Sequence, residues 1–308
     1  MAYKIMILGA SYGSLLGSKL AAAGHDVTLV CRQKTADLIN SKGTEVRIKL
    51  RGEDTHRSFF SMSLGGRTNA VTPEQAQPQE YDLICLAMQE PQYSHPSLRD
   101  LLSRVAKAKV ACMSIMNMPP LPYLKRISSL DCTKLTEAFL NPEIWSEFDP
   151  GLMTLCSPDP QAYRPPEEDP NVLHVGLPTN FKVSKFNNPE LDSMLENIAA
   201  DIDAFRVAGK DVPVKLRVFD SLFVPFAKWA MLATGNYRCI THTGPRSIQS
   251  SVHSNLAKSE SIYDFVNNLV VTLGADHSDM VPFAKYSAAA EGLRNPSSAA
   301  RAVFSGAI

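Results

Sequence analysis

The sequence predicts an α/β fold in which a doubly wound, largely parallel sheet is followed by an all-helical C-terminal domain. Short apolar runs alternate with helical patterns through the first third of the chain. The runs are apolar throughout, which is typical of strands covered on both faces. From about residue 218 onward, helical spacing continues with few strand signals. The 308 residues suffice for about two domains. We place a nucleotide-binding domain at 1–210 and a helical substrate or dimerisation domain at 211–308.

The individual elements follow from apolar runs, helical spacing and the glycines and prolines that end them. The N-terminal domain is predicted to contain strands at 3–8, 27–31, 81–88 and 110–116, with helices at 14–23, 33–41 and 96–106. Residues 44–80 are polar and are predicted to form a hairpin or an excursion off the sheet. In the proline-rich stretch 140–190, short strands are expected near 152–156 and 172–177, followed by a helix at 190–205 and a strand at 212–218. The predicted C-terminal helices span 219–234, 246–256, 259–273, 282–293 and 297–306.

Composition excludes several classes of protein. Lys plus Arg and Asp plus Glu both number 31, so no overall field favours nucleic acid or an anionic membrane. The six cysteines form no CxxC pair and are predicted to be free thiols of a reducing compartment. No apolar run reaches about 18 residues, and the start becomes glycine-rich too early for a signal peptide. We therefore expect a cytoplasmic protein. The histidines show no metal-ligand spacing, so no metal site is expected.

A glycine-rich turn joins the first predicted strand to the first helix. Gly9, Ser11, Tyr12 and Gly13 lie in it, and backbone N–H groups of such a turn can face a pyrophosphate. Ser11 stands where G-x-G-x-x-G has its second glycine, and the loop is one residue short. The alternative is a packing turn without a ligand. The surrounding strand-helix-strand pattern favours dinucleotide binding.

Arg32 indicates which dinucleotide is bound. It follows the second predicted strand, where an acidic residue would bind the ribose hydroxyls of NAD and an arginine suits the 2′-phosphate of NADP. The alternative is a solvated arginine on a loop. Its position favours NADP.

Lys228 is the single charge between Ser221 and Gly235, in a pattern that predicts a helix apolar on every face and therefore buried. A lysine there is costly unless it is paired or functional. Its ammonium could protonate a developing alkoxide or hold a carbonyl oxygen. The alternative is that the side chain reaches solvent at a helix edge. Asn236 follows about two turns later, on a nearby face.

Four segments resemble the ketopantoate reductase (2-dehydropantoate 2-reductase) family: GASYGSLLGSKLAAAGHDVTLVCR, YDLICLAMQEPQ, VACMSIMNMPPLPYL and FAKWAMLATGNYRCIT. The resemblance is best over 1–43 and 81–125, moderate over 218–243 and poor over 126–212. It implies an N-terminal Rossmann-type domain, a helical C-terminal domain, and reduction of a 2-keto acid by NADPH as in pantothenate biosynthesis. A homodimer is one assembly it allows.

The resemblance also implies roles for particular residues. Gly9, Gly13 and Arg32 correspond to cofactor positions, as do Met88 and Gln89 after the third strand. Asn117 resembles the asparagine that contacts nicotinamide ribose and substrate. Lys228 resembles the catalytic lysine, and Asn236 resembles a substrate-binding asparagine. Ser297 and Ser298 resemble the segment whose serine binds the substrate carboxylate.

Departures from the family leave the substrate open. Leu232 replaces an asparagine, Met88-Gln89 replaces a Val-Lys pair, and the family's glutamate would fall just beyond Ile308. Methionines around Asn117 (Met113, Met116 and Met118), with Cys112, suggest a more apolar or adaptable pocket. Three hypotheses remain: a ketopantoate reductase-like enzyme, a related opine-type or other oxo-acid dehydrogenase, and an NADP-binding sensor without turnover.

Overall fold

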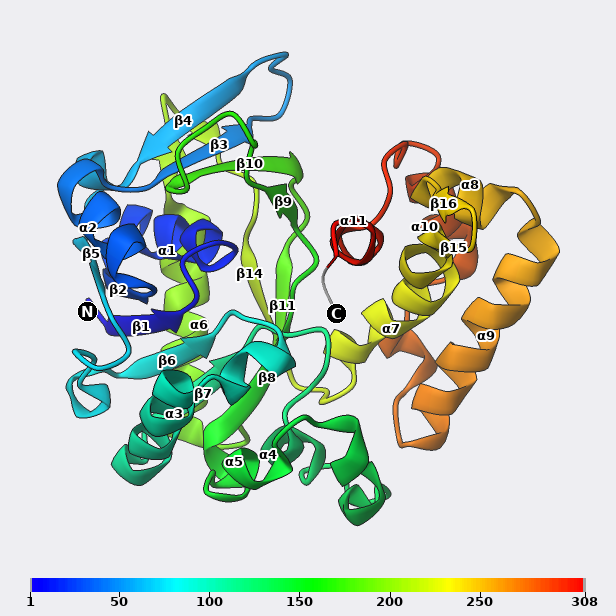
Figure 1. Ribbon diagram of the computed structural model, residues 1–308, viewed down its shortest axis with the longest axis horizontal. Helices are drawn as coiled ribbons and strands as arrows, with labels where there is room; N and C mark the ends of the chain where they lie inside the picture. Colours follow the sequence, from blue (N-terminus) through cyan, green and yellow to red (C-terminus); the bar gives the residue numbers. More distant parts are fainter. Residues whose placement is uncertain (1, 307–308) are drawn as a thin grey trace. The chain divides into compact units, whose positions relative to one another are not determined.

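The computed structural model describes residues 2–306 and divides into two compact units, one ending at Asp220 and one beginning at Ser221 (Figure 1). The division falls ten residues later than the boundary expected from the sequence. The reason is strand β14 (Leu216–Phe219), which pairs in parallel with β11 (Phe181–Ser184) and so belongs to the N-terminal sheet. Each unit is described separately.

An eight-stranded sheet forms the centre of the N-terminal unit. Six strands are parallel, in the order β5-β2-β1-β6-β7-β8. In sequence order, they are β1 (Lys4–Leu8), β2 (Asp26–Val30), β5 (Thr68–Val71), β6 (Leu83–Leu86), β7 (Ala111–Ser114) and β8 (Met153–Ser157). β11 pairs antiparallel with β8 and is followed by β14. Numbered consecutively, the six strands have the order 3-2-1-4-5-6 of a dinucleotide-binding doubly wound sheet, which confirms the predicted fold class.

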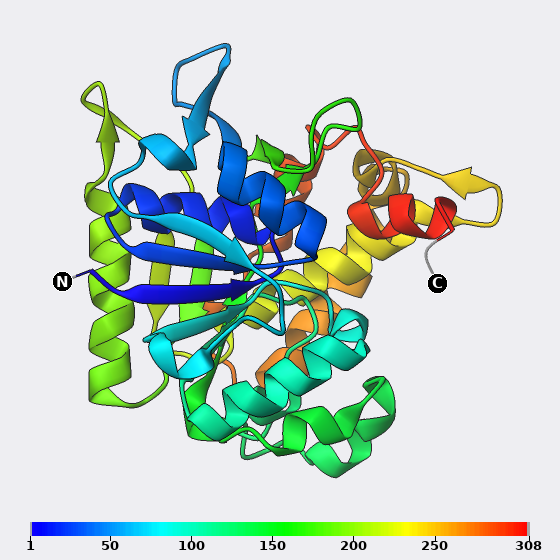
Figure 2. The ribbon, with the colours of Figure 1, turned by 60° about the vertical axis from the view of Figure 1, so that its left-hand side comes forward.

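Helices cover both faces of this sheet. Figure 2 shows α1 (Gly13–Ala22) and α2 (Gln33–Lys42) above the central strands and α3 (Pro96–Ala108) below them. The long helix α6 (Pro189–Ala204) packs on α1 and β14. Its first turn is capped by Asn188, whose side chain accepts from two backbone N–H groups, and its first residue is a proline that needs no donor there. Two short helices, α4 (Leu121–Leu124) and α5 (Pro142–Ser146), contact each other.

The strands of the parallel sheet are apolar because both of their faces are covered. Ile5 and Ile7 of β1 are fully buried in one core with Val27, Leu29 and other apolar residues of the neighbouring elements. Removing most of such a side chain costs about 2–5 kcal/mol of stability. This core holds the carboxyl ends of β1 and β6 side by side, where the predicted cofactor residues lie.

A second sheet, β4-β3-β10-β9, is built from the polar region and the proline-rich region. The hairpin predicted in 44–80 is present as β3 (Glu45–Lys49) and β4 (His56–Phe60). β3 pairs with β10 (Val172–Leu177), which in turn pairs with β9 (Gln161–Tyr163). The same region also supplies β5, which the sequence did not predict. β5 is a four-residue edge strand in which only Ala70 is buried, so its pattern is weak.

The remaining elements of the N-terminal unit are short. The hairpin β12 (Arg206–Val207) and β13 (Lys210–Asp211) follows α6. Turns of 3₁₀-helix are η1 (Ser61–Ser63), η2 (Pro78–Glu80), η3 (Glu90–Ser94), η4 (Cys132–Ala138) and η5 (Pro150–Leu152).

The C-terminal unit is mainly helical, as predicted, but its first helix differs from the expected 219–234. A 3₁₀ turn η6 (Val224–Phe226) leads into α7 (Ala227–Met231), then a π-helical turn η7 (Leu232–Asn236) and a 3₁₀ turn η8 (Tyr237–Cys239). A small hairpin, absent from the prediction, follows. The later elements are β15 (Ile240–Thr241), β16 (Gly244–Pro245), α8 (Ile248–His253), α9 (Leu256–Thr272), η9 (His277–Asp279), α10 (Phe283–Ala290) and α11 (Ser298–Phe304).

The core of the C-terminal unit centres on two stacked tyrosines. The rings of Tyr263 and Tyr286 lie 5.3 Å apart, against Ala230 of α7 and Ala290 of α10. Over residues 2–306, no helix is both long enough and apolar enough to cross a membrane.

Candidate dinucleotide and substrate sites

Gly9 directly follows β1, and its backbone has a conformation that requires glycine. Its φ is +107°, and a Cβ there would lie 2.6 Å from Cγ of Met88 and 3.0 Å from the carbonyl oxygen of Ala87. Its N–H donates to the carbonyl of Val30 at 3.0 Å. The turn therefore packs closely against the residues that follow β6, and it is hydrogen-bonded to the end of β2.

Gly13 begins α1 and lets the helix approach the sheet. A Cβ at this position would lie 2.7 Å from Cγ2 of Ile7. Tyr12 is the N-cap residue, and no side chain caps this helix end. The N-terminus of α1 follows β1, where the strand order reverses between β1 and β6. Folds of this class bind ligands at this place, and a helix N-terminus favours an anion there.

The side chains of Ser11 and Tyr12 differ in exposure and in hydrogen bonding. Ser11 is exposed on the turn. The Tyr12 hydroxyl donates to the carbonyl of Pro160 at 2.7 Å, and its ring meets that of Phe181 edge-on. Burial raises the pKa of Tyr12 well above its usual value. The Tyr12 hydroxyl thus links the turn to the segment before β9.

Arg32 stands at the N-cap of α2, directly after β2, with its side chain exposed. The place matches the sequence expectation, since an acidic or basic residue near this strand end contacts the adenosine ribose in folds of this class. A guanidinium at this position suits a phosphate geometrically and electrostatically.

Met88 and Gln89 lie after β6, and both make hydrogen bonds within the loop that follows this strand. The Met88 N–H donates to the Tyr93 hydroxyl at 3.2 Å, and Gln89 and Gln92 form a reciprocal capping box for η3. The Met88 side chain packs on Gly9, and Gln89 is exposed. Both residues therefore shape the loop beside the glycine turn.

Asn117 follows β7, at the same carboxyl edge of the sheet as Gly9 and Met88, and its side chain is partly exposed. The neighbouring sulfur residues mostly face inward: Cys112, Met113 and Met116 are each 1% exposed. Of the residues expected to make an adaptable pocket, only Met118 is partly exposed.

Lys228 lies in α7 and is partly exposed, so it is less buried than the apolar pattern predicted. The π-helical turn that follows changes its relation to Asn236. In a regular α-helix, eight residues make about 2.2 turns, which leaves the two side chains on different faces. The i→i+5 bonding of a π turn takes up an extra residue and brings the interval nearer to two turns.

The π turn is stabilised from α10. The Tyr286 hydroxyl donates to the carbonyl of Met231 at 3.2 Å. The tyrosine can approach because position 235 is glycine, where a Cβ would lie only 2.0 Å from the tyrosine oxygen. Single π turns inside helices are frequent at functional sites.

The two candidate serines have different hydrogen bonding. The Ser297 hydroxyl caps α11 by accepting from the N–H of Ala300, and it donates to the carbonyl of Asn236 at 2.6 Å. Ser297 is 3% exposed, whereas Ser298 is exposed. The structure therefore joins the Ser297 and Asn236 positions, and Ser298 presents the more accessible hydroxyl.

One residue near the glycine turn was missed by the sequence reasoning. Arg164 follows β9, and its Nη2 donates to the carbonyl of Ala10 at 3.2 Å. It stands in a proline-rich stretch with acidic residues nearby in sequence, where no local pattern distinguishes it. Only the pairing of β9 and β10 with the rest of the second sheet places it there.

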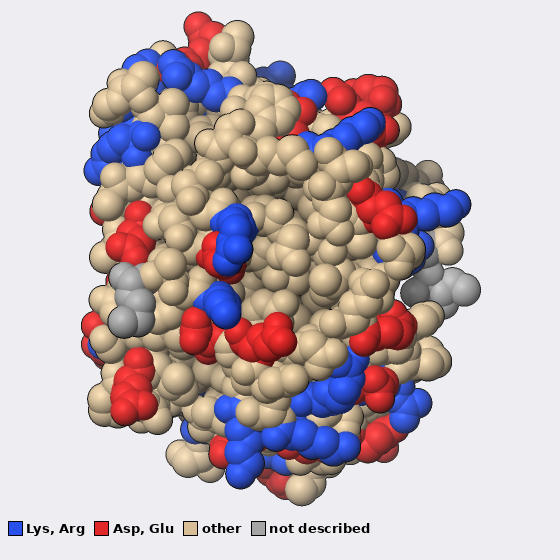
Figure 3. Space-filling model, turned by 90° about the vertical axis from the view of Figure 1, so that its left-hand side faces the viewer, with Lys and Arg blue, Asp and Glu red and all other residues tan. Residues whose placement is uncertain are grey.

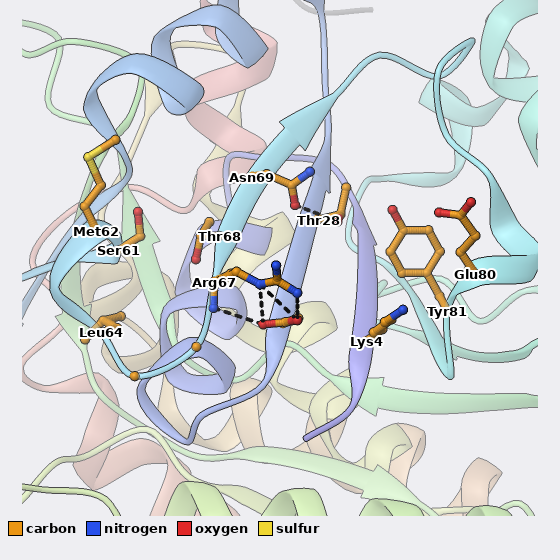
Figure 4. Close-up of a pocket in the computed structure, with 13 residues that line it drawn as sticks. Lys4, Thr28, Ser61, Met62, Leu64, Arg67, Thr68, Asn69, Glu80 and Tyr81 are labelled. Atoms are coloured by element: carbon orange, nitrogen blue, oxygen red, sulfur yellow. Dashed lines mark hydrogen bonds and ion pairs between the residues drawn. The ribbon is translucent and has the colours of Figure 1, made fainter. Parts of the chain in front are cut away.

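A cavity of about 660 Å³ lies at the opposite edge of the sheet, by the amino ends of β1 and β2 (Figure 4). Its lining is largely paired: Arg67 bonds Asp26 at 2.6 Å, and Thr28 donates to Asn69 at 2.8 Å. None of the sequence-predicted site residues lines it. Over residues 2–306, no group of three or more His, Cys, Asp or Glu side chains is arranged to hold a metal ion.

The strand order, the glycine turn and the helix that follows it define a Rossmann-type α/β domain. The sequence model of the family described as ketopantoate reductase PanE/ApbA matches residues 5–117. Residues 5–117 thus match the model of this family, which confirms the resemblance inferred from the motifs of that segment. No curated protein sequence matches the chain.

Solved structures extend the likeness of fold over both units. A probable 2-dehydropantoate 2-reductase from Bacillus subtilis is 15% identical, with a TM-score of 0.59 over 98% of this chain and 87% of that one. A putative ketopantoate reductase from Ralstonia solanacearum is 14% identical, with a TM-score of 0.63 over 98% and 86%. A D-mandelate dehydrogenase, solved with NADH and anilino(oxo)acetate, is 14% identical, with a TM-score of 0.58 over 95% and 80%.

Proposed function

We propose that the protein is an oxidoreductase that reduces a 2-keto acid to a 2-hydroxy acid with NADPH. The observation that carries the proposal is the glycine turn at the reversal of strand order, in a segment of the ketopantoate reductase family. The turn fits a dinucleotide because Gly9 and Gly13 leave no side chain between the backbone and the ends of the strands. Arg32, at the end of β2, supports the preference for the 2′-phosphate.

Each candidate residue has a separate role in this proposed reaction. A bound reduced nicotinamide supplies the hydride that goes to the keto carbon. Lys228 holds the carbonyl oxygen and donates a proton to it, directly or through water, so that the alkoxide is neutralised as it forms. Asn117 orients the nicotinamide ribose and the substrate, and Asn236 orients the substrate. Ser298, or Ser297, binds the carboxylate.

A second candidate is a related dehydrogenase that reduces an opine precursor or another oxo acid. Leu232 favours it, because this buried apolar side chain stands where the family has an amide. Loss of one amide donor changes which substrate is recognised more than it changes the reaction itself. A role in pantothenate synthesis and a homodimeric assembly remain predictions that follow from the resemblance, and a cytoplasmic location remains a prediction from the composition.

The test is a binding titration with NADPH and NADH, followed by turnover of a panel of 2-keto acids. Lys228→Ala is expected to lower kcat by about 10²–10⁴-fold, the usual contribution of a general acid, and to leave the NADPH Kd near that of the wild type. Lys258→Ala, which removes an exposed lysine of α9, is the control and should retain full activity. Dinucleotide binding without turnover of any keto acid would favour a sensor. Absence of dinucleotide binding would remove the proposal.

A separate variant tests the cofactor preference. Arg32→Ala is expected to weaken NADPH binding by about tenfold or more, since hydrogen bonds between charged groups contribute roughly 1.5–3 kcal/mol. NADH binding should change little, because NADH has no 2′-phosphate. An unchanged NADPH-to-NADH ratio would exclude Arg32 from the site.

A further inference from the structure

We propose that Arg164 is a second phosphate-binding residue at the glycine turn and contacts the diphosphate that NADPH and NADH share. The inference rests on the proposed dinucleotide binding and adds a residue outside the segment that matches the family. It comes from a different part of the fold: Arg164 follows β9 of the second sheet, 154 positions after Ala10.

Arg164 lies at the glycine turn. Nη2 of Arg164 donates to the carbonyl of Ala10, the residue that directly follows Gly9 in the turn. A guanidinium has five N–H donors in a planar fork. The bond to Ala10 uses one donor, and others remain for a phosphate beside the N-terminus of α1, which no side chain caps.

Arg164 has another cation near it. Burial lowers the pKa of Arg164, the Cys31 thiol raises it, and the nearby charge of Arg32 lowers it. Across residues 2–306, no carboxylate forms an ion pair with either arginine. The fold therefore holds two cations near each other without a carboxylate partner, and a bound anion would relieve their repulsion.

The segment that carries Arg164 is held in place by contacts just before β9. The Tyr12 hydroxyl bonds the carbonyl of Pro160, and Asp159 pairs with Lys182 of β11 at 3.1 Å. These two contacts fix the chain just before β9. A guanidinium positioned in this way loses little further freedom when it binds a ligand, which favours affinity.

The position also distinguishes the two phosphate groups. In this class of fold, the diphosphate lies at the N-terminus of the first helix, and the adenosine ribose lies near the end of the second strand. Arg164 is anchored on the turn before α1, whereas Arg32 follows β2. Arg164 is therefore assigned to the shared diphosphate and Arg32 to the 2′-phosphate.

The experiment measures the Kd of both dinucleotides by fluorescence titration, without turnover. Arg164→Ala is expected to raise the Kd of NADPH and of NADH by a similar factor, about tenfold. Arg164→Lys keeps the charge but lacks the planar fork, so its Kd should lie between those of the wild type and the alanine variant. Arg51→Ala removes an exposed arginine from the turn between β3 and β4, and it should leave both Kd values unchanged.

The outcomes separate this inference from the proposed function. If the wild type binds dinucleotides and Arg164→Ala binds both equally well, the inference is overturned and the proposed function stands. A loss confined to NADPH would overturn the assignment to the diphosphate. If the wild type binds neither dinucleotide, both proposals fail. Circular dichroism checks folding, and Arg164→Gln, which keeps an N–H donor on a shorter and uncharged side chain, replaces the alanine variant if that variant unfolds.

Discussion

Lys19 is an internal lysine whose ammonium is held by backbone carbonyls. It lies in α1, is 3% exposed, and Nζ donates to the carbonyls of Pro213 at 3.0 Å and Val212 at 3.3 Å. Burial, together with the nearby positive charge of Lys215, lowers the pKa of Lys19 to about 7. A solvated lysine in the unfolded chain titrates near 10.4.

This difference predicts a pH dependence of stability. Between about pH 7 and 10, the unfolded chain holds a proton on Lys19 that the folded protein has released, so stability rises with pH. The slope approaches about 1.4 kcal/mol per pH unit as an upper limit. The window to measure is pH 7–8.5, because thiols of the unfolded chain begin to titrate near 8.5 and act in the opposite direction.

The measurement is urea unfolding of the wild type and of Lys19→Met at several pH values in that window. The methionine variant should lose the rise, whereas Lys34→Met, altered at an exposed lysine, should keep it. Equal slopes for all three proteins would show that Lys19 stays protonated in the folded state.

The positions of candidate site residues could be predicted where a local pattern marks them, and their roles remain predictions. Gly9 and Gly13 were recognisable because they stand between a strand and a helix, and Arg32 because it follows a strand. Arg164 was not recognisable, since its neighbour in the turn is distant in sequence. The use of the Ser297 hydroxyl as a helix cap was also missed, because it depends on where α11 begins.

At the scale of elements, the π turn η7 depends on a contact between α7 and α10. The Tyr286 hydroxyl holds the carbonyl of Met231, and Gly235 provides the space for it. Tyr286→Phe should cost about 1 kcal/mol of stability, the usual net value of one hydrogen bond. Gly235→Ala should cost about 1–3 kcal/mol, because the added methyl group displaces the tyrosine.

The two substitutions should not be additive. Removing the hydroxyl removes the atom that the new methyl group would meet at 2.0 Å, so Tyr286→Phe should partly rescue Gly235→Ala. Chemical denaturation of the two single variants and the double variant measures this coupling. If the two stability costs are additive, the backbone of the turn accommodates the methyl group without displacing Tyr286. If η7 also sets Asn236 relative to Lys228, Gly235→Ala should lower kcat more than it lowers NADPH affinity.

The elements that the sequence predicted are those with long apolar or amphipathic patterns, such as β1, β6, α3 and α6. β5 and β11 were missed because each lies toward an edge of the sheet and neither forms a continuous run of buried apolar residues. The helix expected at 219–234 was wrong because its apolar pattern does not distinguish 3₁₀, α and π turns. Pro225 lies in the 3₁₀ turn η6, before α7 begins.

For the molecule as a whole, positive and negative side chains are equal in number, with 31 of each. On the face shown in Figure 3, acidic and basic side chains are interspersed. A neutral protein attracts an anionic cofactor only through its local groups, so dinucleotide affinity should depend on the basic groups at the site rather than on an overall field.

Bound dinucleotide should stabilise the folded protein by mass action. At a free NADPH concentration of about 100 times Kd, the gain is about 2.7 kcal/mol, which thermal or chemical unfolding detects. Arg32→Ala, examined at the same NADPH concentration, should gain less because its Kd is higher. The prediction fails if NADPH leaves the unfolding midpoint of the wild type unchanged.

The central place of β1 has a consequence for synthesis on the ribosome. β1 pairs with β2 on one side and β6 on the other, and the glycine turn rests against Ala87 and Met88. At about 5–20 residues per second, Met88 is polymerised about 4–16 s after Gly9. Arg164 and Pro160, which tie down the turn from the other side, are polymerised later still. The turn that begins the chain is therefore completed late, and the nascent N-terminus must remain unpaired on one edge until β6 emerges.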